Sequence, residues 1–371
     1  MGPAQLAVLG LAALSVGLGA WAMRRDTPPV WRFAAPAPVP AGGAPRFETV
    51  LDYTPGRGQA HSPGIVVESD GFSVLWFEGS EEAQADVDIH HARFVRDGGA
   101  WMVADSGPRL TRGGLGAVME PRQIVVTLGN TIENEGETNA LYATVASVGG
   151  WAMASVADVR LAADGPTRAH KLNLSPILNR SHLVKSPMVA YADGLPALPA
   201  YFEMGAMHGL LVRFDPRGRV RDTRRIDGAG QPIQPMIVAL SETRGVAFLR
   251  DFGDSRKLLV SRTQDGGQSW SRVEMTEIEN PSSPIAALGL GGDSMLLAVN
   301  DDGDRPEVLR LVLSDDAGQS WRELHRFEGD GALRYPMLRR LDTGEIVLAY
   351  SKGTKQGVMA HVFNPAWVAA Q

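Results

Sequence analysis

A chain of 371 residues with 44% hydrophobic and 21% charged residues is typical of a globular protein and excludes a disordered one. Its net charge of −6 argues against a nucleic-acid partner, because phosphate binding requires a basic face, and its lack of cysteine excludes disulfides, thiol nucleophiles and cysteine-ligated metals. The 42 glycines and 24 prolines indicate many tight turns.

The first segment of the chain is apolar. Residues 4–23 carry no charge, and twenty such residues would just cross a bilayer. We expect a hydrophobic helix over 1–25, acting as a signal anchor or uncleaved signal peptide that places the rest in the periplasm or outside the cell. No basic residue precedes the run, whereas Arg24 and Arg25 follow it, so the positive-inside rule taken alone favours the other orientation, with Arg24 and Arg25 in the cytoplasm. Residues 26–45 are rich in proline and alanine and predict an extended linker, with a folded domain over 46–371.

Two copies of a short motif occur in the C-terminal half. Thr263–Trp270 and Ser314–Trp321 share the pattern Ser/Thr-x-Asp-x-Gly-x-Ser-Trp and lie about 50 residues apart. A hydroxyl and a carboxylate around glycines are typical of a turn whose side chains bond local backbone groups. We therefore predict that these aspartates hold turns and have no catalytic role.

A second marker, a proline followed by an apolar stretch, recurs six times. It occurs at Pro63, Pro121, Pro187, Pro235, Pro284 and Pro336. Each copy is followed by a second β-rich run, and no long helical period appears between them. Short strands at this spacing predict an all-β fold, and six units of about 50 residues predict a six-bladed β-propeller with four strands per blade.

The two short motifs resemble the Asp-boxes of bacterial neuraminidases. The stretches HSPGIVVESDGFSVLWFEG, QPMIVAL and YPMLRRLDTGEIVLAYS resemble blades of the bacterial neuraminidase-repeat branch, and residues 46–364 resemble the sialidase-like propeller superfamily. The resemblance implies a glycoside hydrolase acting on acidic or sialylated glycans. We expect no cofactor, no metal and a monomeric protein, with a carbohydrate and the membrane as its partners.

The position of a site follows from the propeller geometry. Each marker proline begins the first strand of a blade, which is the innermost strand and lines the axis, so the residues just before the prolines face the site. The turn after the second strand returns to the same rim. Arginine, lysine, histidine and carboxylates on one rim suit an anionic or heavily hydroxylated sugar. The candidates for substrate binding on this rim are His61, Glu82, Lys185, Arg250, Asn300, Arg334 and Lys352.

The resemblance also implies roles for single residues. Tyr335 matches the family's tyrosine nucleophile, and Asp86 best matches its acid/base aspartate, with Asp88 and Glu82 as alternates; a partly desolvated rim would raise the pKa of such an acid. Gln234 stands where the family has the glutamate base, and a glutamine cannot accept the proton. Arg256 and Arg305 match two of the three arginines that hold the sugar carboxylate. His61 replaces the third, so His61, Lys185 or Lys352 would supply the missing positive charge.

Three functions are consistent with this partial set. The first is an acidic-sugar glycosidase of the sialidase kind. The second is a non-catalytic glycan-binding propeller at the cell surface, which the two replaced positions favour. The third is a scaffold that binds partners through the flank of the propeller.

Overall fold

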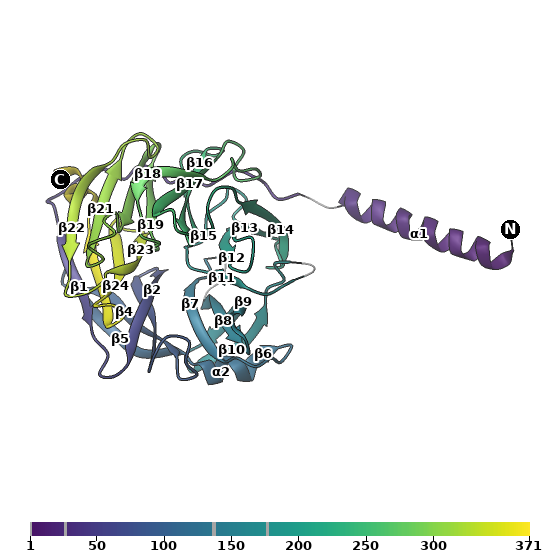
Figure 1. Ribbon diagram of the computed structural model, residues 1–371, viewed down its shortest axis with the longest axis horizontal. Helices are drawn as coiled ribbons and strands as arrows, with labels where there is room; N and C mark the ends of the chain where they lie inside the picture. The colour runs from purple at the N-terminus through teal and green to yellow at the C-terminus, as the bar shows by residue number, and fades with distance from the viewer. Residues whose placement is uncertain (1, 26–27, 136–138, 176–177) are drawn as a thin grey trace. The chain divides into compact units, whose positions relative to one another are not determined.

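Six β-sheets follow one another along the chain and surround a common axis as the blades of a propeller (Figure 1). The computed structural model describes residues 2–25, 28–135, 139–175 and 178–371. It confirms the predicted all-β, six-bladed architecture preceded by an N-terminal helix. Blade one consists of β2 (Gln59–Glu68), β3 (Gly71–Gly79), β4 (Asp88–Asp97) and β5 (Ala100–Leu110).

The next five blades repeat this antiparallel order from the axis outward. Blade two consists of β7 (Thr127–Glu133), β8 (Ala140–Ser147), β9 (Gly150–Ala162), β10 (Gly165–Lys171) and the parallel edge strand β6 (Met119–Glu120). Blade three consists of β11 (His182–Val184), β12 (Leu198–Phe202), β13 (His208–Phe214) and β14 (Val220–Ile226). Blade four consists of β15 (Pro232–Ala239), β16 (Gly245–Asp251), β17 (Lys257–Thr263) and β18 (Glu274–Glu279). Blade five consists of β19 (Ala286–Gly291), β20 (Ser294–Val299), β21 (Val308–Ser314) and β22 (Arg322–Glu328).

Blade six joins the two ends of the propeller. It consists of β23 (Arg334–Arg340), β24 (Ile346–Lys352), β25 (Gly357–Phe363) and, as its outermost strand, β1 (Phe47–Tyr53). Phe47 lies opposite Phe363 in the β1–β25 ladder, and the two rings stack with centroids 5.9 Å apart. This pairing closes the ring of blades, because a strand from the start of the propeller completes the last blade.

Three helices accompany the blades. Helix α1 (Pro3–Arg25) belongs to a separate unit, Met1–Val30, and by length and composition it could cross a membrane, with a mean hydropathy of 1.7 over Pro3–Ala22. Helix α2 (Arg112–Val118) begins after Thr111, whose hydroxyl accepts a hydrogen bond from the Gly114 amide. Helix α3 (Pro365–Ala370) is capped in the same way by Asn364.

A left-handed residue interrupts three of the innermost strands. Ser62, Gln234 and Tyr335 have φ angles of 56°, 54° and 54°, and each directly precedes a marker proline. The ladders of β2, β15 and β23 shift register at these points. A bulge re-aims the side chain of the extra residue, and such a conformation costs a non-glycine residue about 1–2 kcal/mol. The same costly feature in three blades marks this end of the axis as the place to look for a site.

Blade two departs from the predicted register. Pro121 follows β6 on the outer edge of the blade, so it does not mark the innermost strand, and that part of the prediction is wrong. The innermost strand is β7, whose ladder shifts between Leu128 and Thr131. Asn130 lies in this bulge and accepts a hydrogen bond from the Ser62 hydroxyl, which joins blades one and two.

The segment 31–39 is extended, as its composition predicts, but it packs on the propeller. The amide of Phe33 donates to the Glu242 carbonyl (2.8 Å), and its ring is 1% exposed against Tyr191. Arg340 donates to the Ala37 carbonyl at 2.8 Å. A Cβ on Gly266, whose φ is +74°, would lie 2.1 Å from the Trp31 carbonyl oxygen, so this motif glycine also permits the close approach of the segment.

Both short motifs form turns between the third and fourth strands of their blades. The Asp265 carboxylate accepts hydrogen bonds from the Thr263 hydroxyl (2.8 Å) and from the amide and hydroxyl of Ser269 (2.9 and 2.5 Å). Asp316 repeats these bonds in blade five. The predicted role of these aspartates in holding turns is confirmed.

Candidate active site

The side chains around Tyr335 form the candidate site, at the end of the axis where the innermost strands begin. We call this end the funnel. Tyr335 opens β23, remains partly exposed, and packs edge-on against the His61 ring with centroids 4.5 Å apart. Burial raises the pKa of Tyr335, and the nearby charge of Arg250 opposes that rise. The phenol is therefore neutral at pH 7 and accessible from solvent.

Two arginines lie beside this phenol. Arg334 precedes Tyr335 in the chain, and Arg250 lies at the end of β16, opposite Ile233 of the innermost strand. The Arg250 Nε donates to the Ser282 hydroxyl at 3.2 Å. Within the described residues neither arginine makes an ion pair with a carboxylate. Burial and the charge of Arg250 lower the pKa of Arg334, as expected for two cations held close together.

Gln234 lies deep in the same site. Its side chain is 4% exposed, and its Nε2 donates to the Tyr201 hydroxyl at 3.3 Å. The Oε1 atom has no hydrogen-bond partner among the described residues. Gln234 therefore occupies the inner wall but has no group that can accept a proton from Tyr335.

Two glutamates supply negative charge at the site. Glu203 follows β12, and burial raises its pKa while Arg250 opposes that shift. Glu82 lies in the turn between β3 and β4, where it pairs with Lys355. The charges of both glutamates act on the phenol of Tyr335. A carboxylate with a raised pKa is suited to accept a proton near neutral pH, so Glu203 has the property that Gln234 lacks.

Asp86 does not have the property expected of a general acid. It is exposed, and its carboxylate accepts hydrogen bonds from the Ser80 amide (3.1 Å) and hydroxyl (2.9 Å). The Ser80 hydroxyl is the main reason why the pKa of Asp86 is lowered. The expected rise in the pKa of Asp86 is therefore wrong, because the residue lies in solvent and not in a desolvated wall.

His61 and Lys185 cannot supply the missing cation. His61 is 2% exposed, and burial lowers its pKa to about 3, so the ring is neutral. Lys185 is 2% exposed, and its Nζ donates to the carbonyls of Ile285 (2.5 Å) and Pro336 (2.7 Å). Burial lowers the pKa of Lys185 to about 7. Lys185 ties blade three to blades five and six beneath Tyr335, and it does not reach a ligand.

The remaining candidates have partners of their own. Arg256 pairs with Glu279 at 2.7 Å, and Arg305 pairs with Glu307 and Glu328 at 3.2 and 3.3 Å. Lys352 pairs with Asp52. Asn300 is 1% exposed and donates to the carbonyls of Val308 and Leu333, so it holds the backbone. Arg250 and Arg334, and not Arg256 and Arg305, are the arginines that stand beside Tyr335.

Some residues of the site escaped the sequence reasoning. The sequence singled out neither Tyr201 nor Lys355, and it gave Glu203 no role. Tyr201 lies in β12 and Glu203 directly follows the last residue of that strand, so the two lie two positions apart where the strand ends. This spacing was the feature of the sequence from which the two residues could have been assigned to one site. The described residues contain no group of three or more histidine, aspartate or glutamate side chains placed to hold a metal.

Comparisons with known proteins place this geometry in context. A family model described as a BNR repeat-like domain matches residues 70–348. A Dyadobacter fermentans protein of unknown function has a similar structure, with a TM-score of 0.63 and 14% identity over 86% of this chain and 99% of its own. Trypanosoma rangeli sialidase, solved with the inhibitor DANA, gives a TM-score of 0.61 and 13% identity over 83% of this chain and 55% of its own. A Hadza microbial sialidase gives a TM-score of 0.62 and 12% identity over 81% of this chain and 65% of its own. This chain thus spans about half to two thirds of those sialidases, and no curated protein matches it in sequence.

Proposed function

Because this chain belongs to the BNR repeat-like domain family, and sialidases share its fold, we propose that its funnel binds an acidic sugar of a glycan and cleaves the glycosidic bond. The pair Arg250 and Arg334 carries the proposal. Neither guanidinium makes an ion pair with a carboxylate among the described residues, so both stand beside a neutral phenol with donors available for a ligand. A sugar carboxylate would neutralise both, and arginine matches a carboxylate with two parallel hydrogen bonds.

Different residues around the bound sugar carry out different steps of the reaction. Tyr335 attacks the anomeric carbon, and its oxygen–carbon bond forms as the glycosidic carbon–oxygen bond breaks. The phenol proton passes to Glu203, whose raised pKa suits it to receive one. The departing oxygen takes its proton from solvent, because Asp86 has a lowered pKa and Glu82 is already paired with Lys355. Water then attacks the anomeric carbon: its hydroxyl stays on the sugar, its proton goes to solvent, the bond to Tyr335 breaks, and Tyr335 takes its proton back from Glu203.

Turnover by the purified protein tests the proposal. Aryl glycosides of sialic acid and of uronic acids serve as substrates, and the variants are Tyr335→Phe, Glu203→Gln and Arg334→Met, with Arg305→Met as the matched control on the outer rim. We expect release of the acidic sugar, its loss in the three funnel variants, and no change in the control. A folded protein that releases none of these sugars would overturn the hydrolase.

A non-catalytic glycan receptor is the second candidate function. Gln234, which cannot accept a proton, and the lowered pKa of Asp86 favour it. The receptor would bind free sialic acid or a uronic acid without turnover. Its affinity would depend on Arg334 but not on the hydroxyl of Tyr335, so Tyr335→Phe distinguishes the two functions.

We also infer that α1 anchors the propeller to a membrane with the propeller outside the cytoplasm. The apolar Pro3–Ala22 run supports an anchor, and the glycan ligand proposed for the funnel favours the outer side. Protease accessibility in intact cells and in spheroplasts tests the orientation. Digestion only after the cells are lysed would contradict it.

A further inference from the structure

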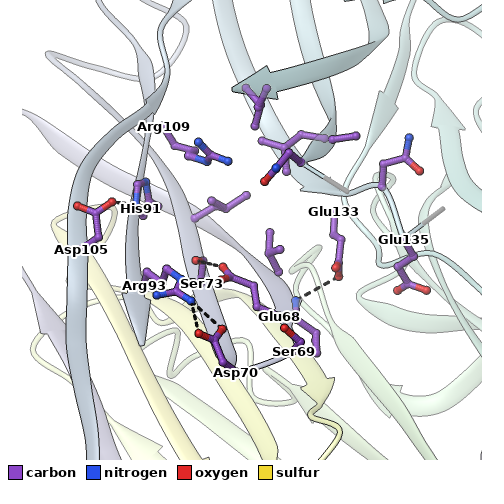
Figure 2. A pocket seen from close by; sticks show the side chains of 18 residues that line it. Glu68, Ser69, Asp70, Ser73, His91, Arg93, Asp105, Arg109, Glu133 and Glu135 are labelled. Carbon is purple, nitrogen blue, oxygen red and sulfur yellow. Dashed lines mark hydrogen bonds and ion pairs between the residues drawn. The ribbon is translucent and has the colours of Figure 1, made fainter. Parts of the chain in front are cut away.

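A cavity lies at the end of the propeller opposite the funnel, between blades one and two. Its volume is about 860 Å³, within the usual range for ligand sites. Strands β2 and β7 begin at the funnel and end at this cavity, with Glu68 and Glu133 as their last residues. Figure 2 shows His91, Arg93 and Arg109 on one side of the cavity and Glu133 and Glu135 on the other. None of these residues takes part in the site at Tyr335.

The blade-one wall is held in place by its own contacts. Arg93 donates from Nε to Glu68 (2.6 Å) and from Nη2 to both oxygens of Asp70 (2.7 Å). His91 is 8% exposed, and its Nε2 lies 3.3 Å from Asp105, while its Nδ1 has no hydrogen-bond partner among the described residues. A wall with fixed rotamers loses little entropy when a ligand binds.

Arg109 is the free donor of the cavity. Its guanidinium extends from β5, and its one hydrogen bond within the described residues is a long one, from Nη1 to the Ala162 carbonyl at 3.4 Å. A guanidinium has five N–H groups, so most of its donors are free for a ligand.

The opposite wall supplies acceptors. Arg339, from the innermost strand of blade six, donates to Glu133 at 3.1 Å and also pairs with Glu135. Burial raises the pKa of Glu133 to about 7 although Arg339 opposes the shift. One arginine thus orients two carboxylates and leaves several of their lone pairs open.

We propose that this cavity binds a neutral saccharide unit, held by its hydroxyls between Arg109 and the carboxylates Glu133 and Glu135. Acceptors and free donors face each other across the cavity, and hydroxyl groups can satisfy both at once. Apolar side chains of Val66, Leu75 and Leu141 line the same cavity and would contact the C–H face of a sugar ring. This inference does not depend on the chemistry proposed for the funnel.

The charge of the cavity selects against other ligands. Five carboxylates line it against two arginines, and Arg339 adds one more cation. The net negative field repels an acidic sugar, so this cavity and the funnel would take different sugars. A purely cationic ligand would face Arg109 on the blade-one side of the cavity.

Saturation-transfer NMR on the full chain in a sugar-free zwitterionic detergent tests the proposal. The probes are methyl galactoside, methyl glucoside and lactose, with sialic acid and spermidine as the acidic and cationic probes. Arg109→Ala removes the free donor. Asp97→Ala, in the exposed β4–β5 turn of the same blade, is the matched control.

We expect at least one neutral sugar to bind, with at least tenfold weaker binding in Arg109→Ala and unchanged binding in Asp97→Ala. No binding of any neutral probe would overturn the proposal. So would binding that Arg109→Ala leaves intact, which would place the sugar elsewhere, or binding of spermidine alone, which would make this a cation site.

Discussion

Replacing Arg334 with methionine should stabilise the fold and weaken ligand binding at the same time. Arg334 and Arg250 are like charges with no carboxylate partner among the described residues, and the lowered pKa of Arg334 reports their repulsion and burial. Methionine keeps the apolar stem but removes the charge. We expect the free energy of unfolding to rise by on the order of 1 kcal/mol, which shifts Tm by about 2 °C in a domain of this size. A charge-assisted hydrogen bond contributes about 1.5–3 kcal/mol, so affinity for an acidic sugar should fall roughly 10- to 100-fold.

Calorimetry measures both quantities on the same protein. Scanning calorimetry gives Tm without ligand, and titration with sialic acid and glucuronic acid gives the affinity. Arg305→Met is the control, because Arg305 already pairs with Glu307 and Glu328, and it should leave the affinity within twofold. A lower Tm in Arg334→Met together with an unchanged affinity would refute the assignment of Arg334 to an anion site.

Three further predictions concern the scaffold. Phe33→Ala should lower the free energy of unfolding, measured in urea, by about 3–5 kcal/mol, because the ring is fully buried. An unchanged urea midpoint would mean that the segment 31–39 does not pack on the propeller. The pKa of Lys185 is lowered to about 7 in the folded protein and is near 10.4 in the unfolded chain, so the unfolded state binds more protons between these values and stability should rise with pH from about 7 to 10. The free energy of unfolding of the wild type, relative to that of Lys185→Met, should therefore rise by on the order of 4 kcal/mol across that range. A difference between the two proteins that does not vary with pH would contradict the lowered pKa of Lys185. Asp265→Ala should lower Tm but leave ligand affinity at the funnel unchanged; a loss of affinity at full stability would give this aspartate a role at the site.

The fold could be predicted from the sequence because its repeats are local. Each turn motif holds itself together through neighbours in the chain, as Asp265 does with Thr263 and Ser269, so its pattern is visible in one dimension. The residues next to the marker prolines, including Arg334 and Tyr335, were found for the same reason. Pro121 led to a wrong position for the innermost strand of blade two, because a proline before a β-rich run also occurs at the edge of a blade, after β6.

The pairing of charges could not be predicted, because it depends on contacts between residues that lie far apart in the chain, within one blade or between blades. Arg250 and Arg256 are close in sequence, but Glu279 pairs with Arg256 and leaves Arg250 to face Tyr335. Lys185 looked like an available cation until its contacts with Ile285 and Pro336 were known. The burial of Phe33 was hidden in the same way, since its partner Tyr191 lies far along the chain.

Covalent trapping tests the central claim, that Tyr335 attacks an acidic sugar in the funnel. The protein is incubated with an activated fluorinated glycoside of sialic acid or of a uronic acid, and its intact mass and peptide map are measured. The account predicts one added sugar on the peptide that carries Tyr335, absent in Tyr335→Phe and unaffected by Arg305→Met. An unmodified protein that still binds the acidic sugar, or an adduct on another residue, would contradict it.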